Sequence, residues 1–402
     1  MTTRAGAPRP VLMIVHSYYE EDPRVRREAE SLVATGRPVV VLGLRQAGGP
    51  DTSLVAGVRV EHLDVQRHQG AGLGIYLREY LSFLFRATWR AVRLHRRERF
   101  ALVQVHSLPD FLVFAALPLK VVGVPVLLDL HEAMPEFFRS RFPGASNPLV
   151  HRLLVLQERL SIALSTATIT VNPPMAERLV GLGVARDKVT VVVNSPSLAR
   201  FDAHAHPRRS FREDGRLRII YTGALTPTYE LDVAVAALAR VAAIRPDLDA
   251  VLDIYGRGDS EPSLLALATE LGMADRIVFH GRVAIDDVPA AVAAADIGLA
   301  PTRHDRFTDM SLSTKVLEYA AMGKPVVASR LPMIEARFPP GTVATYTPGD
   351  AEAMARAILG FVDEPIAREA AVTRTAAIIE AGSWEQEAKG YLGLVQRLIA
   401  RR

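Results

Sequence analysis

A lysine and a glutamate three residues apart form the pair in this sequence whose types and spacing point most directly to chemistry. The stretch 311–329, SLSTKVLEYAAMGKPVVAS, opens with Ser and Thr, spaces its apolar residues about four apart, and closes with a glycine, a proline and a β-branched run. This pattern predicts a loop, a short helix over 313–322 and a buried strand. Thr314, Lys315 and Glu318 then converge near the first turn of that helix.

The place of Lys315 on this helix predicts an anion-binding site. A helix dipole disfavours a cation at its N-terminus, so Lys315 is better placed there if a phosphate lies on the same exposed amides. Glu318, one turn further on, can accept two hydroxyl hydrogens, which is how a carboxylate holds a ribose diol. An ordinary surface pair of Lys and Glu explains the same residues, and this helix alone favours that simpler interpretation.

The segment LSTKVLEYAAMGKPVVAS resembles the nucleotide-sugar-binding segment of the family-four glycosyltransferases. It is most similar to the bacterial members that read Lys-x-x-Glu-Tyr, then small residues and Gly-x-Pro-Val. The resemblance implies an α/β protein of the GT-B fold, with two Rossmann-like parallel-sheet domains facing a cleft, and a reaction that retains the anomeric configuration. The wider family has a second Glu eight residues before Glu318, where this chain has Met310.

The composition is that of a globular chain with two to three domains. The 402 residues are 49% hydrophobic and 23% charged, and they include no Cys, which excludes disulfides, cysteine–zinc sites and thiol nucleophiles. No apolar run reaches the roughly 18 residues of a spanning helix, and the N-terminus lacks the apolar core of a signal peptide. We therefore expect a cytoplasmic protein, with peripheral binding at the inner face of the plasma membrane as an additional hypothesis.

The two halves of the chain differ in charge. Residues 1–208 carry 26 Lys and Arg against 18 Asp and Glu, whereas residues 209–402 carry 22 against 26. A basic N-terminal half suits an anionic acceptor or an acidic membrane, although an arginine-rich composition without binding significance explains it equally well. The predicted helix 72–99 can lie on an anionic membrane, but a solvated face over a core-facing stripe is more common. Its arginines recur at spacings of three and four, at Arg86, Arg90, Arg93 and Arg97.

Short apolar runs alternate with helical patterns through the N-terminal half. The runs 10–15 and 39–44 flank a helix that Asp22 is expected to cap and Pro23 to begin. The loop before this helix, HSYYEED, has no glycine, so it is not a dinucleotide fingerprint and an oxidoreductase is disfavoured. The helix itself, DPRVRREAESLVATG, resembles the first helix of the same bacterial glycosyltransferases. Further strands are predicted at 101–106, 125–130, 167–171 and 188–193, and helices at 110–122, 149–164 and 174–182.

Polar clusters follow two successive predicted strands, HSLPD at 106–110 and DLHEAMPE at 129–136. Ligands bind beyond the carboxyl ends of parallel strands, so both clusters lie where a site is expected, although hydrogen-bonded loop histidines explain them about equally well. The second cluster resembles the family's Asp-x-His-Asp/Glu segment, which implies that His131 approaches the donor sugar and the reacting centre. The expected acceptor-binding residues are Asp22, Arg24, His106, Asp110 and Glu132.

After Asn194 the periodicity is lost, which predicts a linker. A second series of strands alternates with helices such as 231–244 and 260–271, and this pattern predicts a second Rossmann-like sheet. Its strands are expected at 217–221, 250–255, 276–280, 297–300, 325–328 and 343–346. The domains are therefore expected at 1–195 and 216–382, with a linker at 196–215 and a C-terminal helix at 383–402 that, by the resemblance, crosses back to the N-terminal domain.

Glycine follows three of these strands, at Gly223, Gly256 and Gly281, where backbone can approach a ligand closely. Their order before the Lys315 helix resembles the family's donor domain. The family usually has Arg after Gly223 and Lys five residues later to hold the diphosphate, where this chain has Ala224 and Tyr229. Lys315 is then expected to hold the diphosphate alone or with Arg257, Arg303 or Arg306. The expected donor-binding residues are Gly223, Gly256, Arg257, Arg282, Val283, Arg303, Thr314, Lys315, Leu317 and Glu318.

Together these features indicate a retaining glycosyltransferase that moves a sugar from a nucleoside diphosphate sugar to a glycan, lipid-linked or small-molecule acceptor. His131, Lys315 and Glu318 are the expected catalytic residues, and neither a cofactor, a metal nor a nucleic-acid partner is expected. A non-catalytic nucleotide-sugar-binding protein or partner subunit stays open because of the departures at Met310, Ala224 and Tyr229. A GT-B nucleotide-sugar epimerase or a phosphorylase also stays open.

Overall fold

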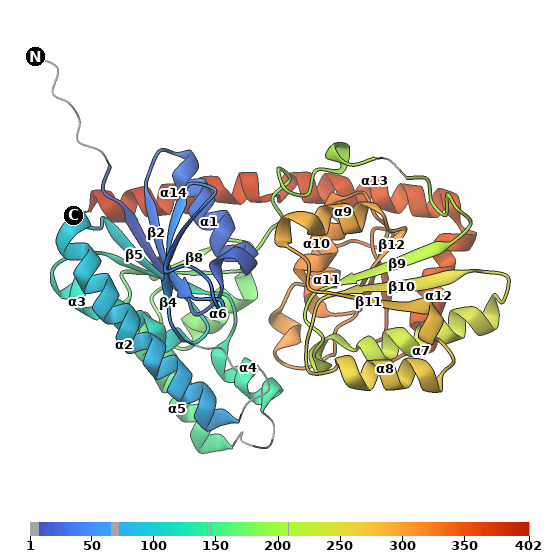
Figure 1. Cartoon of the computed structure of the whole chain (residues 1–402), viewed down its shortest axis with the longest axis horizontal. Coiled ribbons are helices and arrows are strands. Elements are labelled where there is room, and N and C mark those ends of the chain that lie inside the picture. The colour runs from blue at the N-terminus through green and yellow to red at the C-terminus, as the bar shows by residue number, and fades with distance from the viewer. Residues whose placement is uncertain (1–7, 66–71, 143, 145–146, 208, 402) are drawn as a thin grey trace, which may run out of the picture. The chain divides into compact units, whose positions relative to one another are not determined.

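The computed structural model describes residues 8–65, 72–142, 144, 147–207 and 209–401, and these form two compact units. Unit 1 consists of Met1–Asn194 with Glu387–Arg402, and unit 2 of Ser195–Gln386. Each unit contains a sheet with helices packed on both of its faces (Figure 1). Residues 1–7 of the predicted first domain, residue 208 of the predicted linker and residue 402 of the predicted last helix lie outside the described residues.

The sheet of unit 1 has the strand order β3-β4-β2-β1-β5-β6-β7-β8. Neighbouring strands of this sheet pair in parallel, except β3 and β4, which form an antiparallel hairpin at one edge. The central strands are buried along their whole length, because parallel strands covered by helices face the core on both sides. The strands are β1 (Val11–Ile14), β2 (Val39–Leu44), β3 (Thr52–Val55), β4 (Val58–Leu63), β5 (Leu102–His106), β6 (Val126–Leu130), β7 (Ala167–Thr170) and β8 (Val189–Val191).

The helices of unit 1 match the sequence-based prediction at α1 but differ from it after β5. The Asp22 carboxylate accepts hydrogen bonds from the Arg24 and Val25 amides, so α1 begins as predicted. The single helix predicted at 110–122 is wrong, because Pro118 has no N–H to continue a helical turn, and a 3-10 segment η2 (Asp110–Ala116) precedes a short helix. The helices are α1 (Pro23–Ala34), α2 (Leu73–Glu98), α3 (Leu117–Val121), α4 (Met134–Arg141), α5 (Pro148–Leu164) and α6 (Pro173–Gly181).

Unit 2 has an all-parallel sheet with the order β11-β10-β9-β12-β13-β14, as the alternating pattern predicts. One core lies on each face of this sheet, around Leu238 on one side and Tyr319 on the other. The strands are β9 (Leu217–Thr222), β10 (Ala250–Tyr255), β11 (Ile277–Gly281), β12 (Ile297–Ala300), β13 (Val326–Ser329) and β14 (Ala344–Tyr346). The helices are α7 (Leu231–Ile244), α8 (Glu261–Glu270), α9 (Val288–Ala293), α10 (Thr314–Ala321), α11 (Pro332–Arg337), α12 (Ala351–Asp363) and α13 (Pro365–Ala381).

The segments that join the units are packed rather than extended. Within the predicted linker, Phe201 is buried in the unit 2 core. The last helix, α14 (Trp384–Ala400), begins in unit 2, and its residues from Glu387 onward belong to unit 1. In unit 1, Tyr391 Oη donates to Gln104 Oε1 at 2.7 Å, and Glu387 accepts from the Val193 amide at 3.2 Å. Among the described residues, no helix is long and apolar enough to cross a membrane.

Candidate active site

The strand order of each sheet reverses direction next to its first strand, which is where ligands bind in open parallel sheets. In unit 1 the chain proceeds from β1 outward through β2 and then returns to β5 on the other side. In unit 2 the same reversal separates β9 from β12. The polar clusters of the sequence lie at the carboxyl ends of these strands, so each unit has its own candidate ligand-binding edge.

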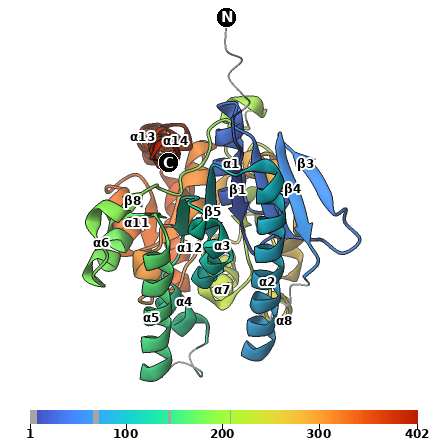
Figure 2. The same cartoon turned by 90° about the vertical axis from the view of Figure 1, so that its left-hand side faces the viewer.

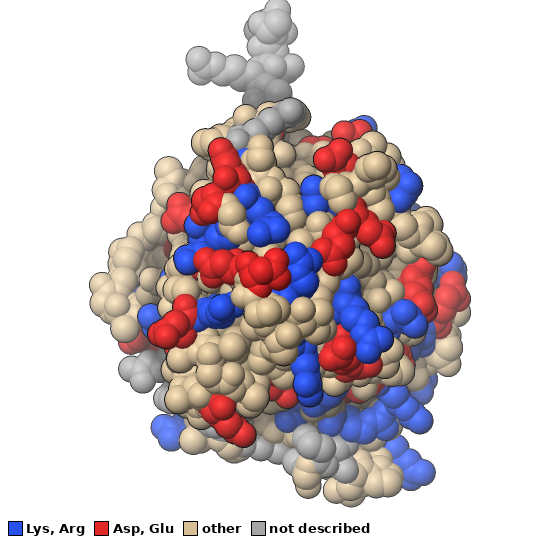
Figure 3. Space-filling view, turned by 90° about the vertical axis from the view of Figure 1, so that its right-hand side faces the viewer, with Lys and Arg blue, Asp and Glu red and all other residues tan. Residues whose placement is uncertain are grey.

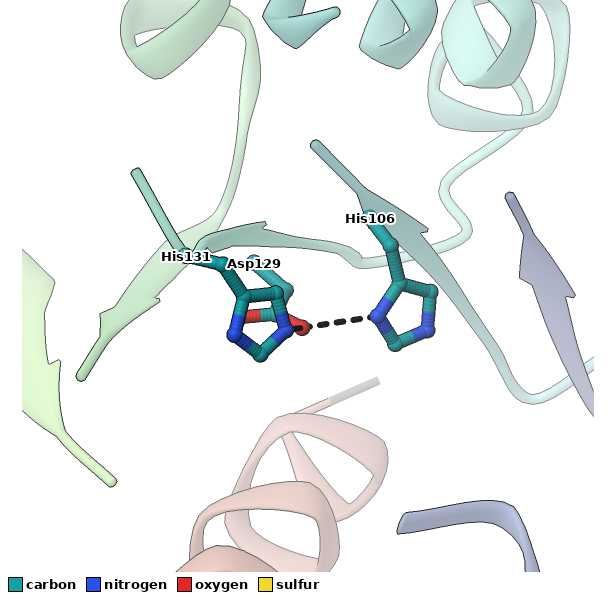
Figure 4. A group of neighbouring side chains, drawn as sticks. All are labelled: His106, Asp129 and His131. Carbon is teal, nitrogen blue, oxygen red and sulfur yellow. Dashed lines mark hydrogen bonds and ion pairs between the residues drawn. The ribbon is translucent and has the colours of Figure 1, made fainter. Parts of the chain in front are cut away.

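In unit 1, two histidines contact one carboxylate oxygen. His106 Nδ1, at the end of β5, lies 2.7 Å from Asp129 Oδ2, and His131 Nε2, just beyond β6, lies 2.6 Å from the same atom. All three side chains are buried, and the two imidazole rings are nearly parallel, with centroids 6.4 Å apart. Figure 4 shows both rings reaching toward Asp129 from neighbouring strands. The His131 amide also donates to Ser107 Oγ at 3.1 Å, which fixes the backbone there.

The surroundings of this cluster separate the pKa values of the two histidines. Burial alone would lower the pKa of His106, but the hydrogen bond to Asp129 and the negative charges around the ring together outweigh burial, and the pKa is raised. Burial prevails at His131, where the positive charge of Arg24 also contributes, and the pKa of His131 is lowered. Burial would raise the pKa of Asp129, yet both imidazoles together hold it well below its usual range. The cluster therefore favours an ionised Asp129, and of its two histidines His106 is the one that holds its proton to the higher pH.

His131 keeps one ring nitrogen available. Its Nδ1 is buried and has no hydrogen-bond partner in the described part of the chain. Because Nε2 faces the Asp129 carboxylate and is the natural place for the single proton of a neutral ring, Nδ1 is left as an acceptor. A buried acceptor of this kind is suited to a hydroxyl group of a bound ligand.

Two predicted acceptor residues, Asp22 and Arg24, are engaged with each other. Asp22 Oδ2 accepts from Arg24 at 3.1 Å and from Ser17 Oγ at 2.9 Å, while Oδ1 caps α1. Burial alone would raise the pKa of Asp22, but the Arg24 charge and these hydrogen bonds hold it well below its usual range. Asp22 thus positions Arg24, whose charge acts on His131 and on the neighbouring Glu132, a carboxyl whose pKa burial raises.

Asp110 is a buried carboxyl without a hydrogen-bond partner in the described residues. Burial, and then the charge of Glu158, raises its pKa well above the usual value, which favours the neutral form that can donate a hydrogen bond. Arg178 joins Glu136 and Glu158 nearby, at 2.8 Å from each. Glu136 lies in the polar cluster that was singled out from the sequence, whereas Glu158 and Arg178 lie within helical patterns and gave no signal.

His16 is a further residue that the sequence analysis missed. It follows β1, and its Nε2 lies 3.1 Å from Glu79 Oε1, with the Tyr80 and Phe83 rings packed edge-on against it. The signal was available, because His16 and Ser17 follow β1 just as His106 and Ser107 end and follow β5. A repeated His-Ser at the ends of adjacent parallel strands would have indicated a shared site.

In unit 2, glycines make room for Lys315 and for one another. Gly223 has φ +143°, and a Cβ on it would lie 2.4 Å from Lys315 Cε. Gly256 has φ +150°, and a Cβ there would lie 1.8 Å from the Gly223 carbonyl oxygen. The Gly256 amide donates to Gly281 O at 2.8 Å. The three predicted glycine turns are therefore adjacent, and the first two require glycine for both conformation and space.

Lys315 is buried at the start of α10 with aromatic neighbours. Its Nζ lies 3.8 Å from the centroid of the Tyr229 ring and 5.3 Å from that of Tyr221. No carboxylate pairs with it among the residues that the structure describes. Aromatic faces stabilise an ammonium without cancelling its charge, so Lys315 can still attract an anion. Ser313 is the N-cap of α10. Its Oγ is also buried, and it has no hydrogen-bond partner among the described residues.

The other predicted donor residues divide into those at the site and those with different roles. Thr314 begins α10 and Glu318 follows one turn later, half-buried. Leu317 is buried in the core, so its side chain is structural. Arg303 pairs with Asp305 at 2.9 Å. The exposed Arg257 and Arg282, with Val283, follow β10 and β11 at the same sheet edge.

Comparison with known protein families covers most of the chain. Residues 22–195 match the family model described as "Glycosyl transferase 4-like domain", and residues 216–364 match the one described as "Glycosyl transferases group 1". The 2-deoxystreptamine glucosyltransferase of Streptomyces kanamyceticus is 24% identical over 355 residues, which are 85% of this chain and 82% of that protein.

Two solved structures resemble the fold over nearly the whole chain. Sucrose-phosphate synthase from Thermosynechococcus elongatus has a TM-score of 0.77 at 17% identity, covering 98% of this chain and 100% of that one. Anabaena HepE, solved in complex with UDP and glucose, has a TM-score of 0.71 at 14% identity, covering 96% and 100%. At such identities the likeness concerns the fold alone.

Proposed function

We propose that this chain, which belongs to the family-four glycosyltransferases of the GT-B fold, is a retaining enzyme that uses Lys315 to hold the diphosphate of its sugar donor. The observation that carries this proposal is the buried Lys315 ammonium, which faces two tyrosine rings and no described carboxylate beside the close-packed Gly223. A buried cation left with its charge at a helix N-terminus favours a bound anion, because the anion neutralises it.

For the donor, we assign the diphosphate to the Gly223 turn, the first amides of α10 and Lys315. Ser313 Oγ, which lacks a described partner, supplies one further hydrogen bond to it. Glu318, one turn along α10, is assigned to the ribose hydroxyls, and the exposed Arg257 to the outer phosphate. The UDP that accompanies HepE in its crystal structure supports uridine as the first base to test. Membership of the Lys-x-x-Glu-Tyr subgroup is part of this proposal.

For the reaction, we assign His131 Nδ1 to a hydroxyl of the transferred sugar, with Asp129, which also contacts His106, holding the His131 ring. No side chain is assigned as nucleophile. The acceptor hydroxyl attacks the sugar carbon on the face from which the diphosphate departs, its proton passes to the departing phosphate oxygen, and Lys315 stabilises the developing charge. Retention of configuration follows from attack and departure on one face.

For the acceptor, the carboxyl groups of unit 1 favour a neutral or amine-bearing polyol. The candidate edge contains Asp110, Glu132 and Glu136, whose carboxyl groups can form hydrogen bonds with hydroxyls and amines, although the overall charge of the N-terminal half suits an anionic acceptor. The name of the relative that acts on 2-deoxystreptamine supports such a polyol. A lipid-linked glycan is compatible with the same hydroxyl-binding groups, and the acceptor test below includes one.

We further propose that transfer needs no metal ion. His106, Asp129 and His131 offer ligand atoms within 4.8 Å of one another, but the described contacts use both imidazoles to hold one carboxylate oxygen. Activity should therefore be unchanged after dialysis against EDTA. Loss of activity that zinc or manganese restores would instead assign a metal to this cluster.

The test of the proposed function is a product assay with UDP-glucose, UDP-N-acetylglucosamine and GDP-mannose as donors, and with 2-deoxystreptamine and a lipid-linked disaccharide as acceptors. We expect one donor to yield a glycoside whose anomeric proton, observed by NMR, has the donor's configuration. Inversion would contradict the retaining assignment. Donor binding without any turnover would favour a non-catalytic protein, acceptor-independent conversion of the donor an epimerase, and phosphate-dependent cleavage a phosphorylase.

A further inference from the structure

The helices on one face of the unit 1 sheet present large apolar side chains to solvent. On α2 these recur every fourth residue and are 39% to 70% exposed, at Leu77, Leu81, Phe85 and Trp89. On α5 they recur every third or fourth residue and are all more than half exposed, at Leu149, Leu153, Leu156 and Leu160. Both spacings place the apolar side chains of a helix on one stripe, but these stripes face water rather than the core.

The two stripes belong to one side of unit 1. Figure 2 shows α2 and α5 along this side with α3 between them. Both long helices contact the intervening η2 segment, and α2 also contacts α3. The exposed Val121 and Val122 at the end of α3 add further apolar surface between the helices. We refer to the solvent side of these three helices as the α2–α3–α5 face.

The exposed charges of α2 and α5 all have one sign. Their exposed charged residues are arginines, and they are Arg78, Arg86, Arg93, Arg96, Arg97, Arg152 and Arg159. The acidic residues of the same helices are turned away or paired: Glu79 is buried against His16, Glu158 is buried against Arg178, and Glu98 is paired with Arg59. By contrast, the face of the molecule drawn in Figure 3 carries acidic and basic side chains interspersed.

We propose that the α2–α3–α5 face binds the surface of an anionic lipid membrane. Leucine, phenylalanine and tryptophan side chains can enter the region between headgroups and acyl chains, while arginines between them reach lipid phosphates. The guanidinium of Arg93 already lies 5.2 Å from the Trp89 ring centroid, an arrangement that keeps the charge next to an interfacial aromatic. A solvated face explains the arginines but not the rows of exposed Leu, Phe and Trp.

A second copy of the chain is a poorer occupant of this face. In a two-fold dimer the same patch meets itself, so the arginine rows of α2 and α5 would face arginines without acidic partners. An anionic lipid surface offers the complementary charge and an apolar layer together. The proposal is independent of sugar transfer, because membrane binding needs neither donor nor acceptor.

The experiment is cosedimentation of the full chain with vesicles of equal parts phosphatidylglycerol and phosphatidylcholine, compared with vesicles of phosphatidylcholine alone. We expect binding to the anionic vesicles, much weaker binding to the neutral ones, and release by added salt. Replacing Arg86 and Arg93 by Gln should weaken binding roughly 25-fold, about fivefold for each arginine. The paired substitutions Phe85→Ser with Trp89→Ser, and Leu153→Ser with Leu156→Ser, should each weaken it at least about tenfold.

The matched control is Ile366→Ser on α13 of unit 2, which removes an 86% exposed apolar side chain outside the face. Its vesicle binding should equal that of the parent chain. Equal binding to both vesicle types, absence of binding to either, or unchanged binding by the face variants would overturn the proposal. So would a dimer, measured by light scattering, that the serine variants convert to monomer while vesicles are not bound. All substitutions are at exposed positions, and an unchanged melting temperature checks that each variant is folded.

Discussion

Lys315 is buried, yet the groups around its ammonium are the faces of Tyr229 and Tyr221 rather than a carboxylate. Tyr221 is itself fixed, since its Oη donates to the Ala224 carbonyl oxygen at 2.7 Å. The two positions where the resemblance leads one to expect cations, Ala224 and Tyr229, thus take part in the surroundings of Lys315. This explains physically how the chain can depart from the family pattern and still present a positive charge to a diphosphate.

The ring of Tyr229 should matter through its aromatic face and not its hydroxyl. Tyr229→Leu should weaken UDP binding by about 5- to 30-fold, because a desolvated cation–π contact is worth about 1 to 2 kcal/mol and the ammonium would lose its position. Tyr229→Phe should bind like the parent chain. Isothermal titration with UDP measures both, and equal losses in the two variants would show that the hydroxyl, or the fold, is responsible instead.

Glu28 is a buried carboxyl near the histidine cluster, and it accepts a hydrogen bond from the Gln104 side chain. Burial, and then the negative charge of Asp129, raises the pKa of Glu28 from 4.5 to about 8. Between these values the folded protein holds a proton that the unfolded chain has released. The free energy of unfolding therefore falls as pH rises through this range, by about 1.4 kcal/mol per pH unit for one such group.

Glu28→Gln removes this titration while keeping an oxygen that can accept from Gln104. The free energy of unfolding of the variant should fall less than that of the parent chain between pH values of about 5 and about 8, as measured by urea denaturation. Groups with a lowered pKa, such as Asp129, lose their stabilising effect only at more acidic pH, so they do not enter this comparison. Identical pH profiles of the two proteins would contradict the account.

At the scale of elements, the sequence was sufficient wherever local chemistry decides the structure. The N-cap and proline of α1 and the β-branched strands of unit 2 were predicted within a residue or two, because capping and burial act locally. The β3–β4 hairpin was missed, since β3 alternates exposed and half-buried residues over only four positions. The contacts of Lys315 with Tyr229 and of Arg178 with Glu158 join different elements, so spacing along the chain could not predict them.

The turn after β9 should tolerate no side chain. Gly223→Ala places a Cβ in an unfavourable backbone region and against Lys315, so it should lower stability by about 1 to 3 kcal/mol and weaken UDP binding as well. Gly272→Ala is the matched control, because Gly272 also has positive φ but open space around its Cβ position. The Gly272→Ala control should lose stability but bind UDP as tightly as the parent chain. If both variants bind UDP equally well, the turn is not part of the donor site.

At the scale of the whole molecule, each of the two units has its own candidate residues, and the unfolding of each unit can be followed separately. The chain has two tryptophans, and Trp89 lies in unit 1 while Trp384 lies in unit 2. Trp384 is buried at the start of α14, so its fluorescence should report the unfolding of unit 2. Replacing Trp89 by Phe would leave Trp384 as the single tryptophan probe.

In the Trp89→Phe protein, saturating UDP should raise the stability that Trp384 reports. At about one hundred times its dissociation constant, a ligand adds about 2.7 kcal/mol to the state that binds it. The reciprocal Trp384→Phe protein should show a smaller effect if the units unfold separately, and an equal one if they unfold together. If UDP raised the stability reported by Trp89 but not that reported by Trp384, the nucleotide would bind to unit 1, which would contradict the proposed donor site in unit 2.

The most direct test of the central claim, that the Lys315 charge holds the donor diphosphate, is calorimetric titration of UDP into the parent chain and into Lys315→Gln. Arg240→Gln, which removes one exposed positive charge on α7 of the same unit, is the control. A charge-assisted hydrogen bond is worth about 1.5 to 3 kcal/mol, so we predict affinity about 10- to 100-fold weaker for Lys315→Gln and unchanged for Arg240→Gln. Equal affinity of Lys315→Gln and the parent chain would contradict the account.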